Sequence, residues 1–273
     1  MRLASLHTHP VKGCHRLDHD TVHVEPWGLA GDRRWLIVDE HGTGVTQRDT
    51  AALVHVRPAP RPGGGLTLHA TGRPALDVPE PAPTGDALDV QIFVNRTPVA
   101  ATPAGTAADD WLSTLLDRKV RLVWLANPAD QPIGTELSRP EDRVSFADRY
   151  PMLVTNSASL DALNSLLLEA GDVEAPIPMN RFRANLVVGD AEPWAEDDWI
   201  GRRLRFGNVV MRAVKPCARC LVTTIDQETG EKGRQPLRLL ARHRNHDQKL
   251  LFGVNLIPDD TGPVTVGDPV EVI

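Results

Sequence analysis

Short apolar runs separated by turn residues dominate the first hundred residues of the chain. Each run is long enough for a β-strand and too short for a helix. In RWLIVDEHGTGVT, the turn DEHGTG separates two apolar runs, which predicts a hairpin. Proline and glycine mark 57–65 and 79–86 as loops. The other runs predicted as strands are TVHVEPWG, GLTLHA, ALDVQIFV and TPVAAT.

Three segments instead repeat their apolar residues at helical spacing. They are AADDWLSTLLDR at 107–118, SASLDALNSLLLEAG at 157–171 and PLRLLARHR at 236–244. We expect serines to cap the start of the second helix and Gly171 to end it. The apolar run YPMLVT leads directly into this helix, and polar groups at a helix N-terminus suit a bound anion.

The rest of the chain is again predicted to form strands. Many short strands with a few helices predict a mainly β (α+β) fold, built as closed or nearly closed barrels. These later runs are RLVWLA, RANLVVGD, RRLRFGNVVMRAV, LVTTID at 221–226, LLFGVNLIP and GPVTVGDPVEVI.

Composition narrows the class of protein. The 273 residues are 41% hydrophobic and 24% charged, as in soluble globular proteins. Three cysteines fit a reducing compartment, and neither a signal peptide nor a membrane-spanning apolar run is visible, so we expect a cytoplasmic protein without a membrane partner. A net charge of −6 argues against nucleic-acid binding. Local arginine clusters such as RFR at 181–183 still suit a small anion.

The most unusual stretch is KPCARC at 215–220, which leaves four interpretations open. A zinc site would pair Cys217 and Cys220 with His243 and His246, although this spacing is outside the usual range. A redox pair is disfavoured because a predicted strand, rather than a helix, follows. The cysteines could simply pack in the interior. Alternatively, one thiolate beside Lys215 could be a protein ligand to a soft metal that a cofactor carries.

The last interpretation needs an anion-binding shell elsewhere in the chain, and several segments offer one. They combine cations with amide or hydroxyl groups, which together suit a ligand that carries phosphate. Hydrolase, P-loop and zincin motifs are absent from the sequence. The candidate segments are HPVKG with Lys12, GDRRW with Arg33 and Arg34, LVTNSAS with Thr155, Asn156 and Ser157, and NRFRAN with Arg181, Arg183, Asn180 and Asn185.

In order along the chain, these segments resemble the MOSC proteins, the relatives of the C-terminal domain of molybdenum-cofactor sulfurase. More narrowly, they resemble the branch that contains the mitochondrial amidoxime-reducing component and its bacterial counterparts. The resemblance covers nearly the whole chain and depends on HPVKG, GLAGDRRWLIVDEHGTGVTQRD, FADRYPMLVTNSASLDALN, MNRFRANLVVGDAEPWAEDDW and VKPCARCLVTTIDQETG.

The resemblance implies an N-terminal β-rich domain at 1–105 and a MOSC β-barrel domain at 106–273. It implies a molybdenum–molybdopterin cofactor with Cys217 as the protein ligand to the metal and the catalytic residue, and it gives no reason to expect pyridoxal phosphate. The family's lysine is often followed by serine, whereas Gly13 follows here, and Cys14 has no assigned role. The residues implied to hold the pterin and its phosphate are Lys12, Gly13, Arg33, Thr155, Asn156, Arg183, Asn185 and Lys215.

The implied activity is reduction of small N-hydroxylated substrates such as hydroxylamines, amidoximes or N-hydroxylated bases. Some bacterial relatives append a ferredoxin-like domain with a cysteine cluster, which this sequence lacks. We therefore expect a separate electron donor of ferredoxin, flavodoxin or cytochrome type with its reductase. Two alternatives remain: a sulfur carrier with a persulfide on Cys217 that Cys220 could resolve, and a non-catalytic cofactor-binding protein.

Overall fold

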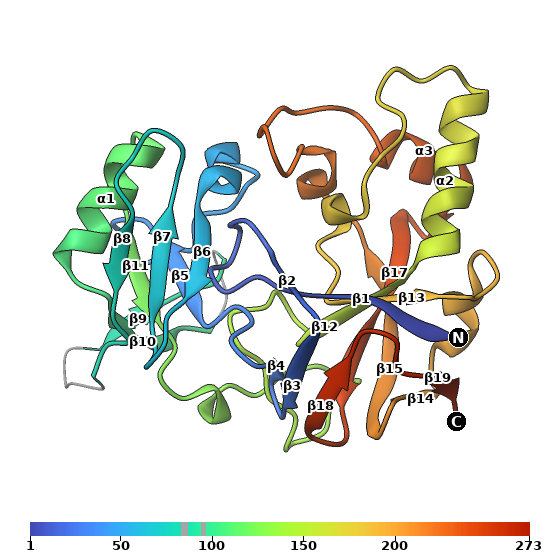
Figure 1. Cartoon of the computed structure of the whole chain (residues 1–273), viewed down its shortest axis with the longest axis horizontal. Helices are drawn as coiled ribbons and strands as arrows, with labels where there is room; N and C mark the ends of the chain where they lie inside the picture. The colour runs from blue at the N-terminus through green and yellow to red at the C-terminus, as the bar shows by residue number, and fades with distance from the viewer. Residues whose placement is uncertain (83–86, 94–96) are drawn as a thin grey trace.

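A computed structural model describes residues 1–82, 87–93 and 97–273 (Figure 1). Its largest element, within these residues, is a nine-stranded sheet in which only β12 and β13 pair in parallel. Most of the regular structure consists of strands, which confirms the predicted mainly β fold. The two central strands β12 and β13 are buried along their whole length and are mostly apolar. The strand order is β19 (Val270–Val272), β14 (Arg203–Phe206), β15 (Val209–Ala218), β17 (Lys249–Pro258), β12 (Met152–Asn156), β13 (Leu186–Gly189), β1 (Arg2–Thr8) and β2 (Leu17–His19), and β16 (Asn245–His246) pairs with β17.

The two ends of this sheet curl toward each other. An isolated bridge joins Arg2 of β1 to Pro269, the residue before β19. The backbone amide of Val270 also donates to the carbonyl of Met1 at 2.9 Å. The sheet is thus nearly closed, and it encloses an apolar core that includes Leu6, Phe206 and Leu256. Figure 1 accordingly shows the N- and C-termini on the same side of the molecule.

The other half of the molecule, on the left of Figure 1, holds two smaller sheets and a helix. Helix α1 (Thr106–Leu116) confirms the predicted helix. It packs against β8 (Leu76–Val78), β11 (Arg121–Trp124) and the 3₁₀ helix η1 (Ala51–His55). The core between them includes Trp35, Leu112 and Leu122. One sheet has the order β5 (Trp35–Val38), β11 (Arg121–Trp124), β10 (Val99–Pro103), β9 (Leu88–Val90), and the other the order β6 (Arg57–Pro60), β7 (Leu66–His69), β8 (Leu76–Val78).

The first thirty residues connect the two halves. Strands β1 and β2 belong to the large sheet, and β3 (Thr21–Glu25) pairs with both β4 (Gly28–Leu29) and β18 (Gly262–Thr265). The earliest strands therefore lie beside the latest ones, while α1 lies with the smaller sheets. The division of the chain at residue 105 stays a prediction.

Helices α2 (Ser157–Glu169) and α3 (Leu237–His243) cover the upper right of Figure 1 and confirm the predicted helices. Their apolar faces pack with Phe182 and Phe252, whose rings stack with centroids 3.9 Å apart. The prediction that serine caps α2 was wrong. The side chain of Asn156 is the cap, and it accepts from the amide of Ala158 at 3.0 Å.

Two local predictions were also wrong. Residues 57–60 form β6 rather than a loop, because Pro58 and Pro60 lie in a strand at the edge of its sheet, where prolines are tolerated. The segment LVTTID contains a 3₁₀ helix, η5 (Leu221–Thr224), rather than a strand. There Thr223 and Thr224 bond their hydroxyls to carbonyls three residues back, which competes with strand pairing. Of the loop predicted at 79–86, residues 83–86 lie outside the described part.

In the part of the chain that the structure describes, no helix has the length and apolar character needed to cross a bilayer.

Candidate functional site

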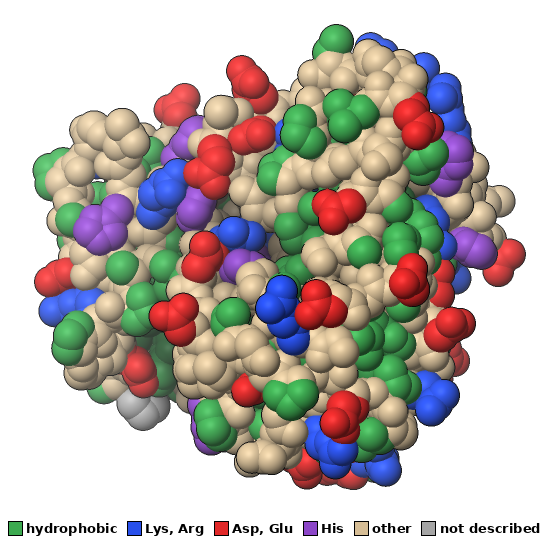
Figure 2. Space-filling view, turned by 45° about the vertical axis from the view of Figure 1, so that its right-hand side comes forward, with side chains coloured by type: hydrophobic (Ala, Val, Ile, Leu, Met, Phe, Trp, Pro, Cys, Tyr) green, Lys and Arg blue, Asp and Glu red, His purple; other side chains and the backbone are tan. Residues whose placement is uncertain are grey.

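A cavity of about 610 Å³ lies between the two halves, and most of the predicted site residues line it. Among its described lining residues, eight are Lys or Arg, and Asp148 carries the only carboxylate. On the face shown in Figure 2, by contrast, acidic and basic side chains are interspersed. The excess of positive charge is thus a feature of the cavity. The predicted residues on its wall are Lys12, Gly13, Arg33, Arg183, Asn185, Lys215 and Cys217.

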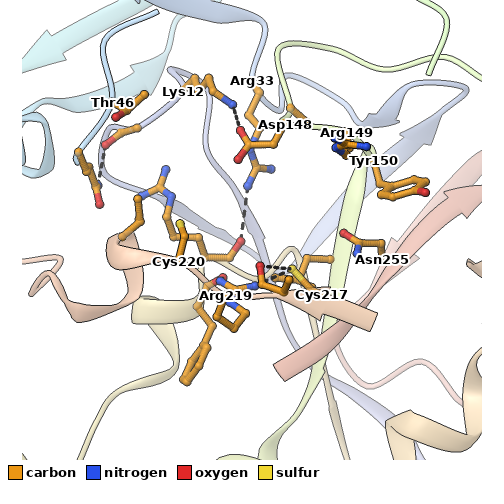
Figure 3. A pocket seen from close by; sticks show the side chains of 18 of the residues that line it. Lys12, Arg33, Thr46, Asp148, Arg149, Tyr150, Cys217, Arg219, Cys220 and Asn255 are labelled. Carbon is orange, nitrogen blue, oxygen red and sulfur yellow. Dashed lines mark hydrogen bonds and ion pairs between the residues drawn. The ribbon is translucent and has the colours of Figure 1, made fainter. Parts of the chain in front are cut away.

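Lys12 follows β1 and is held from two sides. Its ammonium donates to the carbonyl of Phe146 at 2.8 Å and forms an ion pair with Asp148 (Figure 3). Burial lowers the pKa of Lys12, and the Asp148 carboxylate opposes that change. Desolvation works against ionisation of Asp148 as well, but the positive charges of Lys12, Arg33 and Arg48 together outweigh it, and the pKa of Asp148 lies below its usual value. The only carboxylate among the described lining residues is therefore paired with Lys12.

Arg33 and Arg183 both have left-handed backbones, with φ of 50° and 53°. This conformation is uncommon for residues other than glycine and is found most often at functional sites. Arg33 forms an ion pair with the buried Asp32 and donates to Oδ1 of Asn185 at 3.3 Å. Its Nη2 reaches the backbone carbonyl of Arg183 at 3.5 Å. The two arginines are thus close neighbours, each on a strained backbone.

The guanidinium of Arg183 is only half satisfied. Its Nη1 donates to Gln227 at 2.9 Å, whereas Nη2 is buried and has no partner among the described residues. Burial, and then the positive charge of Arg33, lower the pKa of Arg183 to about 10. A half-buried cation with a buried, unpaired donor and a like-charged neighbour is stabilised when an anion binds. The cavity therefore fits a ligand that carries a phosphate or a comparable anionic group.

Asn185, at the start of β13, has a locked side chain. Its Oδ1 accepts from the amide of Leu153 at 3.2 Å, and its Nδ2 donates to the carbonyl of His7 at 3.1 Å. The side chain is almost fully buried and ties β13 to β1 and β12. Asn185 therefore fixes the position of Arg33 through a rigid amide.

Thr155 and Asn156 are the two predicted site residues that do not line the cavity. Both are fully buried at the end of β12. Thr155 bonds its hydroxyl to the sulfur of Met179 at 3.3 Å. Asn156 caps α2 and donates to the carbonyl of Glu192 at 2.7 Å. The structure does not bring these two side chains together with the arginines.

Cys217 lies near the end of β15, where the pairing with β17 shifts register twice. Such bulges redirect side chains, and the half-buried Cys217 lines the cavity. Nη1 of Arg219 donates to its sulfur at 3.0 Å, while Nη2 of Arg219 donates to the carbonyl of Phe182 at 2.6 Å. In Figure 3, Cys217 lies across the cavity from Lys12. The site thus places a soft sulfur ligand opposite a group of cations.

Cys220 lines the same cavity and precedes η5. Its sulfur accepts from Nη2 of Arg48 at 3.4 Å, and it is a free thiol like Cys217. The sequence analysis disfavoured a redox pair because it predicted a strand after Cys220. That argument was wrong, since the 3₁₀ helix η5 follows instead. No group of three or more His, Cys, Asp or Glu side chains within metal-binding reach was found in the described residues. Within the described residues, Cys217 and Cys220 therefore have no further side chains with which to form a zinc site.

Cys14 is fully buried and does not line the cavity. Burial raises the pKa of its thiol to about 12, so it is neutral at physiological pH. It packs in the core with Val11 and Leu53. Cys14 has the environment of a core residue.

Several residues of the site were not predicted from the sequence. Asp148 stands in FADRYP, Gln47 and Arg48 in VTQRD, and Gln227 in DQETG. These strings contributed to the resemblance, but single polar residues in loops carry no spacing signal that shows what they face. A cavity whose walls come from both halves could only be seen in three dimensions.

Two family models match the chain. The MOSC N-terminal beta barrel domain matches residues 1–119, and the MOSC domain matches residues 141–271. The human protein named mitochondrial amidoxime-reducing component 1 is 31% identical over 99% of this chain and 82% of its own length. The chain belongs to the MOSC family.

Other relatives share this family and carry related names. Mitochondrial amidoxime reducing component 2 from Bos taurus is 29% identical over 98% of this chain and 82% of its own length. The molybdenum cofactor sulfurase of Danio rerio is 30% identical over 93% of this chain but only 31% of its own length. These MOSC relatives support a function connected with the molybdenum cofactor.

Proposed function

We propose that this MOSC protein is a molybdenum-cofactor-dependent oxidoreductase that reduces small N-hydroxylated compounds. The observation that carries the proposal is Nη2 of Arg183, which has no partner among the described residues and belongs to a cation-rich cavity that Cys217 also lines. The names of the amidoxime-reducing relatives supply the reaction class. Substrates of this class include hydroxylamines, amidoximes and N-hydroxylated bases.

Different residues on the cavity wall would bind different parts of the cofactor. Arg183, with Arg33 beside it, would bind the phosphate through charged N–H donors. Lys12 and Lys215 would add positive charge, and Gly13, whose φ is 83°, lets the backbone turn next to Lys12. Cys217 would be the protein ligand to molybdenum.

Reduction of an N–OH group to N–H consumes two electrons and two protons and releases water. When bound, a molybdenum cofactor supplies a metal that takes up electrons singly and passes them on in pairs. The protein holds the cofactor and orients the sulfur of Cys217, which Arg219 fixes through its 3.0 Å hydrogen bond. A separate donor of ferredoxin, flavodoxin or cytochrome type, with its reductase, would deliver the electrons.

The first test is the molybdenum and pterin content of protein expressed in a host that makes the cofactor. Elemental analysis and the fluorescence of oxidised pterin should each give about one equivalent per chain. Loaded protein should then reduce an amidoxime such as benzamidoxime with a chemical electron donor. Protein that contains neither metal nor pterin would contradict the proposal.

Cys220 supports a second candidate, a protein that carries sulfur for the cofactor. It shares the cavity with Cys217, so it could resolve a persulfide on that residue. Purified protein would then release thiocyanate when treated with cyanide, and Cys217→Ser would abolish this release. A protein that binds the cofactor without catalysis would instead hold molybdenum and pterin and show no turnover.

A further inference from the structure

Two glutamines from distant parts of the sequence form a buried pair beside the cavity. Nε2 of Gln47 donates to Oε1 of Gln227 at 2.9 Å, and Nε2 of Gln227 donates back to Oε1 of Gln47 at 3.0 Å. Both side chains are buried, with 1% and 4% of their surface exposed. The pair joins the loop after β5 to the turn after η5, across the boundary between the two halves.

The surrounding backbone fixes which way each amide faces. Nε2 of Gln47 also donates to the carbonyl of Gly13 at 2.7 Å, and Nε2 of Gln227 also donates to the carbonyl of Ile225 at 3.0 Å. A carbonyl oxygen accepts but cannot donate, so each NH₂ group must point toward its carbonyl. Oε1 of Gln227 is thereby directed to Arg183, whose Nη1 donates to it at 2.9 Å.

We propose that Gln47 and Gln227 are positioning residues that hold Arg183 so that its Nη2 faces the bound anion. The inference rests on the proposed function, in which that anion is the phosphate of the molybdenum cofactor. Arg183 needs such support because its backbone is left-handed and Arg33 repels it. Without an acceptor at Gln227, its guanidinium would turn away from Arg33.

A neutral acceptor suits this task better than a carboxylate. A glutamate at position 227 would pair with Arg183 and cancel the charge that the ligand needs. The amide oxygen directs the guanidinium and leaves its charge available. Because Gln47 also bonds Gly13, the pair links this arginine to the turn beside Lys12. One chain of hydrogen bonds thus runs from Arg183 through the two glutamines to the backbone beside Lys12.

The test compares cofactor retention in Gln227→Met and Gln47→Met with that in wild type. Retention is the pterin left per chain after timed dialysis, measured by fluorescence, with the melting temperature recorded for each protein. We expect Gln227→Met to lose pterin about tenfold faster, since a hydrogen bond to a charged group is broken. Gln47→Met should show a smaller loss, because Oε1 of Gln227 remains.

Gln235→Met is the matched control. Gln235 is equally buried and donates to Asp172 at 2.7 Å, but its hydrogen bonds among the described residues reach neither Arg183 nor Gly13. It should lose stability and still retain pterin as wild type does. If the two test variants retain pterin as well as this control does, the inference is wrong. If Gln227→Met does not fold, Gln47→Met decides the question alone.

A double variant shows whether Gln227 acts through Arg183. Arg183→Met should itself speed pterin loss, and adding Gln227→Met should then change the rate no further, because residues of one unit are not additive. Additive losses would indicate a merely structural role and overturn the inference. Gln227→Glu should also retain pterin poorly, although it keeps an oxygen acceptor; wild-type retention in that variant would count against the argument.

These outcomes separate the inference from the proposed function. If wild type takes up molybdenum and pterin but the glutamine variants match Gln235→Met, only the positioning role fails. If wild type takes up neither under cofactor-competent expression, the proposed function and the inference both fail.

Discussion

Arg33 and Arg183 lie next to each other in the cavity, each with a left-handed backbone, and Nη2 of Arg33 reaches the carbonyl of Arg183 at 3.5 Å. Two like charges on strained backbones destabilise the empty protein. In the proposed function, this arrangement would trade stability of the cofactor-free protein for affinity toward an anion.

A first prediction follows from this trade. Arg183→Met should raise the free energy of unfolding of the cofactor-free protein by about 1 kcal/mol, because a half-buried cation with a like-charged neighbour is replaced by an apolar side chain. Urea denaturation measures the change. Sulfate or inorganic phosphate should raise the melting temperature of wild type and have a weaker effect on the variant. A variant less stable than wild type would show that Arg183 stabilises the empty fold.

Asp32 predicts a pH dependence of stability. It is fully buried, and although burial opposes its ionisation, Arg33 and His9 lower its pKa to about 2. A carboxyl with a lowered pKa in the folded state stabilises the protein above its unfolded pKa, near 4, and this contribution is lost as the pH falls toward 2. Asp32→Asn should therefore cost about 2 kcal/mol at pH 7.

The measurement is urea denaturation of wild type and Asp32→Asn from pH 7 down to pH 3. The difference in the free energy of unfolding should be constant at neutral pH and shrink below about pH 4. A difference that does not depend on pH would mean that Asp32 contributes through packing or neutral hydrogen bonds.

The two cavity cysteines should behave differently. If Cys217 is the metal ligand, Cys217→Ser should abolish reductase activity and lower the molybdenum content, because a hydroxyl is a poor ligand for a soft site. Cys220→Ser is the matched control, since it lies in the same cavity and also accepts from an arginine. It should retain metal and most of its activity. Equal losses in both variants would contradict a single-ligand role for Cys217.

The backbone of Gly13 predicts a loss of stability when serine replaces it. Its φ is 83°, and a Cβ there would lie 3.1 Å from a methyl group of Leu53. Gly13→Ser should therefore destabilise the fold by about 2 kcal/mol, from backbone strain and crowding. Gly72→Ser, with φ of 75° and no neighbour within 4 Å, should cost about 1 kcal/mol. Equal costs would show that Leu53 moves aside.

The sequence predicted the features that depend on local pattern. The helical periods of 107–118, 157–171 and 236–244 gave α1, α2 and α3, and short apolar runs gave the mainly β fold. The resemblance gave the family and a group of residues of which seven line the cavity. The prediction of secondary structure from the sequence failed where side chains form hydrogen bonds with the local backbone. This happened in LVTTID and at the N-terminal cap of α2.

Tertiary partners could not be predicted in this way. The pairing of Gln47 with Gln227 spans 180 residues, and nothing in either local sequence marks it. Likewise, Lys12 was predicted to meet a phosphate, but its ammonium already pairs with Asp148, which lies 136 residues away. Such partners depend on how the two halves meet, which composition and spacing do not encode.

The bridge between Arg2 and Pro269 has a consequence for how the molecule forms. Strand β1 is synthesised long before the segment around β19, which must be present before the large sheet can close. Until that segment is made, Met1 and Arg2 lack the backbone partners that Val270 and Pro269 provide. Pairings of such long sequence separation form slowly. We therefore expect closure of the large sheet to be among the last events of folding.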